Sequence, residues 1–127
     1  MIEPLATPFL ESANKGALSA QQCTACGRNQ LPPKARCQRC GGVAMRWVRL
    51  SGRGAVVSYA VLHRGPTAEY GQRVPYIYGV VELEEGPRIV TNILADPATL
   101  SVGQVVGAVF VRSDDEGQRW PEFEPER

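Results

Sequence analysis

Four cysteines stand in two matched pairs, Cys23 with Cys26 and Cys37 with Cys40, and they are the only cysteines of the chain. Two residues separate the members of each pair, and a glycine follows each pair. A C-x-x-C turn directs two sulfurs toward one point, and the glycine lets the backbone adopt φ > 0 with its N–H groups facing the thiolates. Two such turns on opposing strands would enclose a tetrahedral metal ion. The spacing therefore predicts a zinc ribbon with these four ligands.

Other uses of paired cysteines fit the pattern less well. Disulfides belong to oxidising compartments, and Met1 to Leu5 show neither the basic start nor the apolar stretch of a secretory signal. No apolar run is long enough to span a bilayer, so we expect a cytoplasmic protein with reduced thiols. Redox sites of the thioredoxin type carry one C-x-x-C. Zinc is the expected metal, iron fits the same thiolates, and a closed shell of four predicts a structural role.

Short elements are predicted around the cysteines. Thr7 suits a helix N-cap and Pro8 the first helical position, and Gly16 suits the end of that helix. Residues 31–34, Leu-Pro-Pro-Lys, predict a stiff, extended tip between the cysteine pairs. Residues 45–50 alternate apolar and basic side chains, which predicts a half-buried strand.

After residue 54 the pattern is all-β. The first strand is expected to place Val57, Tyr59 and Val61 on one side. A single helical turn or a loop is expected at 96–99, a polar loop at 65–75 and a turn at 113–117. The predicted strands cover residues 55–63, 76–83, 88–93, 105–111 and 119–123.

Five or six short strands with glycine punctuation predict a small barrel or sandwich. A five-stranded Greek-key barrel of the OB type fits the count and the length, and periodicity alone does not separate it from a six-stranded sandwich. The expected fold is therefore mainly β, with three units: a helical lead-in at 1–16, a zinc ribbon at 17–50 and an OB-fold at 51–127.

Basic residues concentrate in the stretch from Cys23 to Arg53, which has no acidic residue. They are Arg28, Lys34, Arg36, Arg39, Arg46, Arg49 and Arg53. This stretch is either a solvated face that offsets the thiolate charge or a surface for a phosphate-bearing ligand or an acidic partner. Residues 55–127 carry six basic and eleven acidic residues, which argues against a nucleic-acid groove on the barrel.

No catalytic constellation stands out in the sequence. His63 is the only histidine, no nucleophile accompanies it, and the cysteines are assigned to metal. No Gly-rich phosphate loop follows a strand and opens a helix. Tyr59, Tyr70, Tyr76 and Tyr78 are candidates for a pocket lining or, equally, for the sheet surface and core. Residue chemistry alone therefore predicts a binding or scaffold protein.

The order of motifs resembles the family catalogued as domain of unknown function 35. The match runs from about Phe9 to Phe123, and its most specific part is the Ser-Gly-x-Gly segment just after the ribbon. The matching motifs are the helix with Phe9, the two C-x-x-C-G turns, Leu31-Pro32-Pro33, Trp47-Val48, Ser51-Gly52-Arg53-Gly54, Val57-Ser58-Tyr59, Pro75-Tyr76, Val81 to Gly86, Thr91-Asn92, Val102-Gly103 and Pro121-Glu122-Phe123.

This resemblance implies a rubredoxin-like zinc ribbon joined to an OB-fold, with the four cysteines as metal ligands. It also implies a non-catalytic accessory subunit that binds CoA or acyl-CoA and supports a thiolase-like enzyme in lipid, steroid or other acyl-CoA metabolism. The alternative is a protein that binds single-stranded nucleic acid. The candidate residues for the ligand are Arg49, Arg53, Tyr59 and Tyr76.

Two positions depart from the family pattern. Many members have a Phe-Trp pair in the N-terminal helix, whereas Leu10 follows Phe9 here, which bears on any N-terminal contribution to a ligand tunnel. Many have proline after the third cysteine, where this chain has Gln38, and that change leaves the metal ligands intact.

Overall fold

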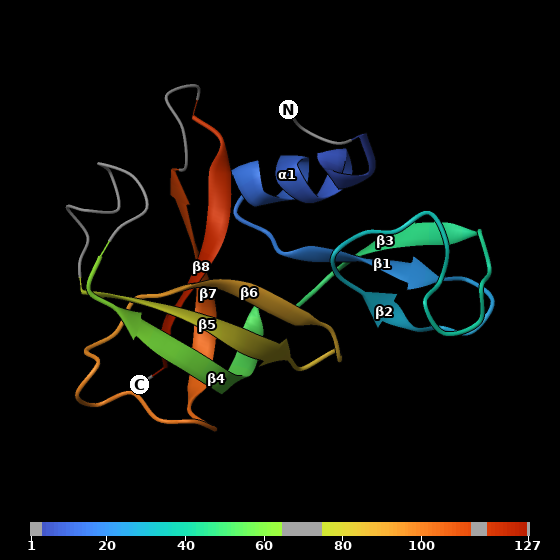
Figure 1. Ribbon diagram of the computed structural model, residues 1–127. Coiled ribbons are helices and arrows are strands. Elements are labelled where there is room, and N and C mark those ends of the chain that lie inside the picture. Colours follow the sequence, from blue (N-terminus) through green and yellow to red (C-terminus); the bar gives the residue numbers. More distant parts are fainter. Residues whose placement is uncertain (1–3, 65–74, 113–116, 127) are drawn as a thin grey trace.

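The computed structural model describes residues 4–64, 75–112 and 117–126. Apart from Pro75 and Gly117, the predicted loop at 65–75 and the predicted turn at 113–117 lie outside the described residues. A small three-stranded ribbon and a closed barrel lie side by side, and the helix α1 packs against strands of both (Figure 1). Neither described helix has the length and apolar character that a membrane-spanning helix requires.

The N-terminal segment consists of a 3-10 turn, η1 (Pro4–Ala6), followed by α1 (Thr7–Asn14). The predicted N-cap at Thr7 is wrong, since Ala6 is the N-cap and makes no side-chain cap bond. Because η1 leads directly into α1 and Ala6 already has helical φ and ψ, Thr7 begins the helix itself. Pro8 is therefore the second helical residue, one position later than predicted, and still lies in the first turn. Gly16 has φ of 77° and its N–H bonds to Ala13 O, so the helix ends where expected.

The ribbon sheet has the order β2–β1–β3, with all neighbours antiparallel. Its strands are β1 (Ser19–Cys23), β2 (Asn29–Gln30) and β3 (Met45–Arg49). The strand predicted at 45–50 is confirmed as β3. The prediction that the second cysteine turn lies on a strand is wrong. The described segment between β2 and β3, which contains this turn, carries no strand. Pro32 and Pro33 lack the N–H groups that a hairpin ladder would need there.

The barrel closes in the strand order β4–β5–β6–β8–β7. All pairs are antiparallel except β6 with β8, which pair in parallel at Ile93 and Phe123. Closure confirms the OB-type barrel and excludes the sandwich. The strands are β4 (Arg53–Leu62), β5 (Tyr76–Leu83), β6 (Arg88–Ile93), β7 (Val105–Arg112) and β8 (Arg119–Pro125).

A β-bulge in β4 changes which side chains face the core. Val56 pairs with Val81 and Ser58 with Val80, so Val57 is the extra residue. Val56 is therefore buried in the core, and Tyr59 packs against it from beyond the bulge. The prediction that Val57 shares a face with Tyr59 is wrong, because strict alternation does not anticipate an inserted residue.

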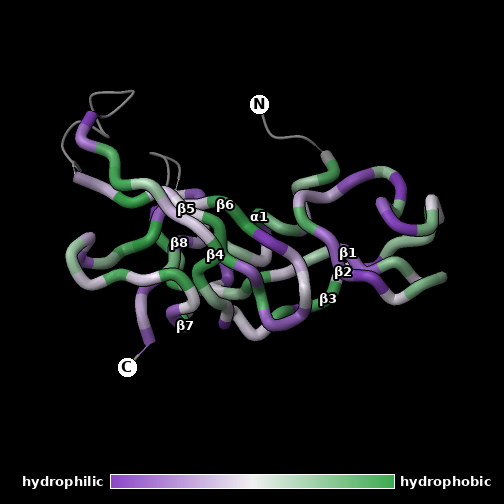
Figure 2. Tube along the Cα trace, turned by 60° about the horizontal axis from the view of Figure 1, so that its bottom comes forward, coloured by the Kyte–Doolittle hydropathy of each residue, from purple (hydrophilic) through white to green (hydrophobic). Residues whose placement is uncertain are grey.

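The barrel and the ribbon differ in what stabilises them. Apolar residues run through β4, β5 and β6, whereas β1 and β2 are largely polar (Figure 2). A turn at residues 96–100 closes one end of the barrel with buried Leu100, whose N–H bonds to Asp96 O. The barrel therefore has its own hydrophobic core, while the ribbon depends on other interactions. The fully buried large side chains include Val56, Ile77, Val81, Val106 and Phe123.

Candidate metal centre

Two similar turns present the four sulfurs. In the first, the Gly27 N–H bonds to Cys23 O at 2.8 Å, and Gly27 has φ of 80°. In the second, the Gly41 N–H bonds to Cys37 O at 2.9 Å, and Gly41 has φ of 76°. Only glycine takes this conformation without strain, which accounts for the glycine after each pair.

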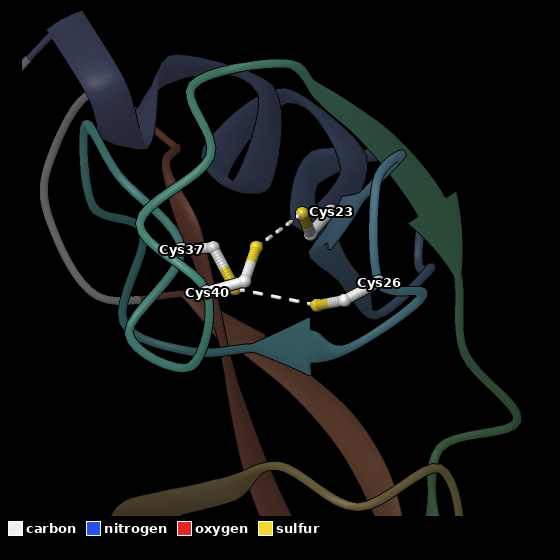
Figure 3. A group of neighbouring side chains, drawn as sticks. All are labelled: Cys23, Cys26, Cys37 and Cys40. Atoms are coloured by element: carbon white, nitrogen blue, oxygen red, sulfur yellow. Dashed lines mark hydrogen bonds between the residues drawn. The ribbon is translucent and has the colours of Figure 1, made fainter.

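The sulfurs of the two turns converge on one point. All four Sγ atoms lie within 4.8 Å of one another. The contacts between Cys23 and Cys40 and between Cys26 and Cys37 are each 3.6 Å, and each joins one turn to the other (Figure 3). Ligands bonded to zinc at about 2.3 Å stand about 3.8 Å apart at the corners of a tetrahedron. The geometry therefore fits a tetrahedral metal ion.

Backbone N–H groups favour the thiolate form of two of the four cysteines. The N–H of Cys40 is the main cause that lowers the pKa of Cys37 to about 6. The N–H of Cys26 similarly lowers the pKa of Cys23. The Gly42 N–H favours the Cys40 thiolate, but the three neighbouring sulfurs outweigh it and raise the pKa of Cys40 to about 11. Four thiolates cannot share this space without a positive charge, so the donor set fits Zn²⁺ held in a closed, structural site.

Two buried glutamines hold the metal turns in place. Gln30 Nε2 donates to Gln21 Oε1 at 3.0 Å, which joins β2 to β1. The Gln21 oxygen also accepts the Lys34 N–H at 2.8 Å, and the Gln30 oxygen accepts the Gln38 N–H at 3.1 Å. These bonds fix the tip and the second cysteine turn. Sequence reasoning missed both glutamines, because no local pattern distinguishes a buried glutamine from a solvated one.

The ribbon and the barrel meet at the Ser51-Gly52-Arg53-Gly54 segment. Arg49 and Arg53 line one small depression of about 210 Å³ there. The Arg53 guanidinium is bound within the chain, to Glu126 at 2.8 Å and to Glu84 at 3.3 Å. Glu85 closes the same junction, because its Oε2 accepts the Ser51 N–H at 2.7 Å. Arg49 is exposed at the end of β3.

Comparison with known proteins finds a family model for the ribbon and another for the barrel. The family model "ChsH2, rubredoxin-like zinc ribbon domain" matches residues 10–46, and "ChsH2, C-terminal OB-fold domain" matches residues 47–111. A DUF35 domain-containing scaffold protein of Methanothermobacter thermautotrophicus is 33% identical, over 80% of this chain and 77% of that protein. The chain belongs to the DUF35 family. The predicted family and fold are thereby confirmed.

Other relatives carry the names of enzyme subunits. A probable enoyl-CoA hydratase alpha subunit of Thermomonospora curvata is 34% identical over 85% of this chain, which spans 34% of that protein's length. The benzoylsuccinyl-CoA thiolase subunit BbsA of Thauera aromatica is 29% identical over 65% of this chain and 55% of that subunit. A solved chain described as Ltp2-ChsH2(DUF35) aldolase superposes with a TM-score of 0.87 at 33% identity, covering 98% of this chain and 96% of that one.

The DUF35 structure does not gather the four predicted ligand residues on one surface. Arg49 and Arg53 share the junction, but Tyr59 donates its hydroxyl to Leu100 O at 2.9 Å at the closed end of the barrel. Tyr76 lies on β5 opposite Leu62. The tyrosines therefore do not line the junction depression with the arginines.

Proposed function

We propose that this chain is a non-catalytic accessory subunit that docks a thiolase-fold enzyme of the thiolase, acyltransferase or retro-aldolase type. In that complex it supports the partner and helps to hold CoA or a CoA thioester, in lipid, steroid or other acyl-CoA metabolism. The observation that carries this proposal is the superposition of nearly the whole chain on the Ltp2-ChsH2(DUF35) aldolase chain. The subunit names of the other relatives support it.

The side-chain chemistry supports a non-catalytic role. The sulfurs of all four cysteines point into the metal centre. His63, the only histidine of the chain, is exposed just beyond the end of β4. A nucleophile needs an adjacent base and an enclosed site, and these residues supply neither.

The test is reconstitution with a thiolase-like protein encoded beside this chain. The two proteins should co-purify, and CoA-thioester turnover should require the partner. The zinc-loaded chain alone should not cleave acyl-CoA or β-hydroxyacyl-CoA substrates above the buffer rate. Turnover by the chain alone would overturn the non-catalytic role, and failure to assemble with any neighbouring thiolase-fold protein would overturn the docking role.

A further inference from the structure

The four sulfurs of the metal centre form two close pairs, and each pair joins one cysteine turn to the other. Cys23 Sγ lies 3.6 Å from Cys40 Sγ, and Cys26 Sγ lies 3.6 Å from Cys37 Sγ (Figure 3). In each pair one residue is buried and one is exposed, because Cys23 and Cys37 are buried and the other two are exposed. A reagent from solvent would therefore meet an exposed cysteine that has a buried sulfur of the opposite turn beside it.

Gly42 leaves one side of the Cys23–Cys40 pair uncovered. A Cβ at this position would lie 3.3 Å from Cys40 Sγ and 3.5 Å from Cys23 Sγ. The Gly42 N–H donates to Cys40 Sγ at 3.4 Å, so the backbone approaches this sulfur while no side chain covers it. The exposed Cys40 is therefore open to a small reagent at a point that any larger residue would obstruct.

This arrangement has the parts that a reversible oxidation of cysteine requires. The thiolate is the form of cysteine that binds a metal and also the form that reacts with a peroxide. An exposed thiolate with a second cysteine beside it ends as a disulfide, because the neighbour attacks the oxidised sulfur before further oxidation occurs. A disulfide has an S–S distance of about 2.05 Å, so the 3.6 Å contacts need to shorten by only about 1.5 Å.

We propose that the metal centre is a modification site for hydrogen peroxide, and that its oxidation forms the cross-turn disulfides Cys23–Cys40 and Cys26–Cys37. The exposed member of each pair is the residue that the peroxide oxidises, and the buried member is the residue that completes the disulfide. The choice of partners follows from the positions of the sulfurs and does not depend on the proposed function.

The reaction consumes one peroxide for each disulfide. The Cys40 thiolate attacks a peroxide oxygen, so an S–O bond forms, the O–O bond breaks and hydroxide leaves. The Cys23 thiolate then attacks the Cys40 sulfur, so the S–S bond forms, the S–O bond breaks and a second hydroxide leaves. Two thiolates have then lost two electrons, and the peroxide has gained them. Cys26 and Cys37 react with a second peroxide in the same way, and a chain without thiolates releases its zinc ion.

The cross-turn pairing should keep the ribbon closed after the metal has left. Cys23 and Cys40 are 17 residues apart and Cys26 and Cys37 are 11 apart, so each disulfide closes a loop that contains the tip. Such a cross-link restricts the unfolded chain and so favours the folded ribbon. Disulfides within the turns would leave the two turns unconnected. Oxidation and chelation should therefore both remove zinc but have opposite effects on the fold of the ribbon.

The test uses the zinc-loaded full chain without a partner. Hydrogen peroxide is added, the released zinc is measured with a weakly binding zinc dye, and the amide exchange of the ribbon is followed. Zinc release should parallel disulfide formation, and the oxidised ribbon should keep its protection from exchange. A chelator without peroxide should remove both the zinc and the protection. A thiol reductant together with added zinc should restore the loaded chain.

Peptide mapping by mass spectrometry identifies the disulfides. Tryptic cleavage after Arg39 separates Cys37 from Cys40, whereas Cys23 and Cys26 stay on one peptide. Cross-turn pairing should therefore link this peptide to both of the others, and fragmentation between Cys23 and Cys26 assigns each partner. The zinc-free chain oxidised in denaturant is the control and should give a mixture of pairings.

Two sets of variants test the separate roles of these residues. Gly42→Ala should retain zinc but release it several-fold more slowly with peroxide, because the added methyl group covers the Cys40 sulfur. Val43→Ala is the matched control at the adjacent, exposed position and should react at the parent rate. Cys23→Ser removes the sulfur that completes the disulfide, so a 1,3-diketone probe should trap Cys40 as a sulfenic acid. Cys37→Ser should give the equivalent trapping at Cys26.

The parent chain decides the assignment, whether or not each variant folds. Disulfides within the turns, or sulfinic acids without disulfides, would overturn it. So would retention of zinc at a peroxide concentration that fully oxidises the denatured, zinc-free chain. Loss of the ribbon's exchange protection together with the zinc would show that the cross-links do not replace the metal. Equal rates of zinc release from zinc-loaded Gly42→Ala and Val43→Ala would exclude Gly42 as the point of access.

Discussion

Arg53 and Glu126 form a two-pronged ion pair between the first residue of β4 and the segment just after β8. Arg53 Nε lies 2.8 Å from Glu126 Oε1, and Arg53 Nη2 lies 2.8 Å from Glu126 Oε2. Glu84 approaches the same guanidinium at 3.3 Å. The Arg53 guanidinium in this fork geometry faces carboxylates of its own chain. The ion pair therefore links β4, the first barrel strand in the chain, to the end of β8, the last.

This pair predicts a pH-dependent contribution to stability. The Arg53 hydrogen bonds and charge lower the pKa of Glu126. Because this pKa is lower in the folded state than the unfolded-state pKa of about 4.3, the ion pair stabilises the fold at pH values above about 4.3. The contribution is lost as the pH falls through the pKa of the folded state. Glu126→Gln should therefore lower the melting temperature at neutral pH and have little effect in acid below both values.

The control for this pair is Glu124→Gln, an exposed carboxylate on β8. It should leave the melting temperature nearly unchanged across the same range of pH. Since Arg53 and Glu126 are partly exposed, high salt should reduce the effect of Glu126→Gln. A loss of stability that persists unchanged in acid would show that the charge pair is not its cause.

Arg49 and Arg53 should respond differently to charge reversal. Arg53→Glu would place a third carboxylate beside Glu84 and Glu126 and should lower the melting temperature. Arg49→Glu should leave the melting temperature unchanged but weaken co-purification with the partner, because Arg49 is exposed at the junction and makes no ion pair among the described residues. Unchanged assembly with Arg49→Glu would exclude Arg49 from the docking surface.

The metal centre should be structural and hold about one zinc ion per chain. Chelation should unfold the ribbon, because its polar strands have little core of their own, and should leave the barrel largely folded. Cys37→Ser should lower the zinc content and the ribbon's protection from amide exchange. Thr24→Ala changes the first cysteine turn without touching a sulfur and should keep its zinc. Absence of zinc and iron from the purified parent chain would contradict this assignment.

Two barrel glycines should not tolerate a side chain. A Cβ at Gly54 would lie 2.5 Å from Glu82 O, and a Cβ at Gly79 would lie 2.8 Å from Ser58 O. Backbone atoms of a paired strand cannot move aside cheaply, so each Gly→Ala variant should cost about 1–3 kcal/mol of unfolding free energy or more. Ser58→Ala, at an exposed position of β4, is the control for chemical denaturation and should be near neutral. Full stability of Gly54→Ala would show that the strands can separate there.

The sequence by itself determined the metal site and most of the strands. The cysteine spacing is a local property, because each C-x-x-C-G turn aims its own two sulfurs and uses its own glycine at positive φ. The hairpin pattern likewise predicted β5 and β6 with their observed bounds. These features depend on residues within one turn or one strand, and that is the range over which a sequence pattern acts.

Only the tertiary structure decided the partners of the charged and polar groups. Arg53 binds a carboxylate 73 residues away, and Gln30 is buried because β1 and the second cysteine turn surround it. The bulge at Val57 depends in the same way on how β4 pairs with β5. Barrel closure brings distant segments together, and the burial and charge of each neighbour then set what a side chain does. No local pattern contains that information.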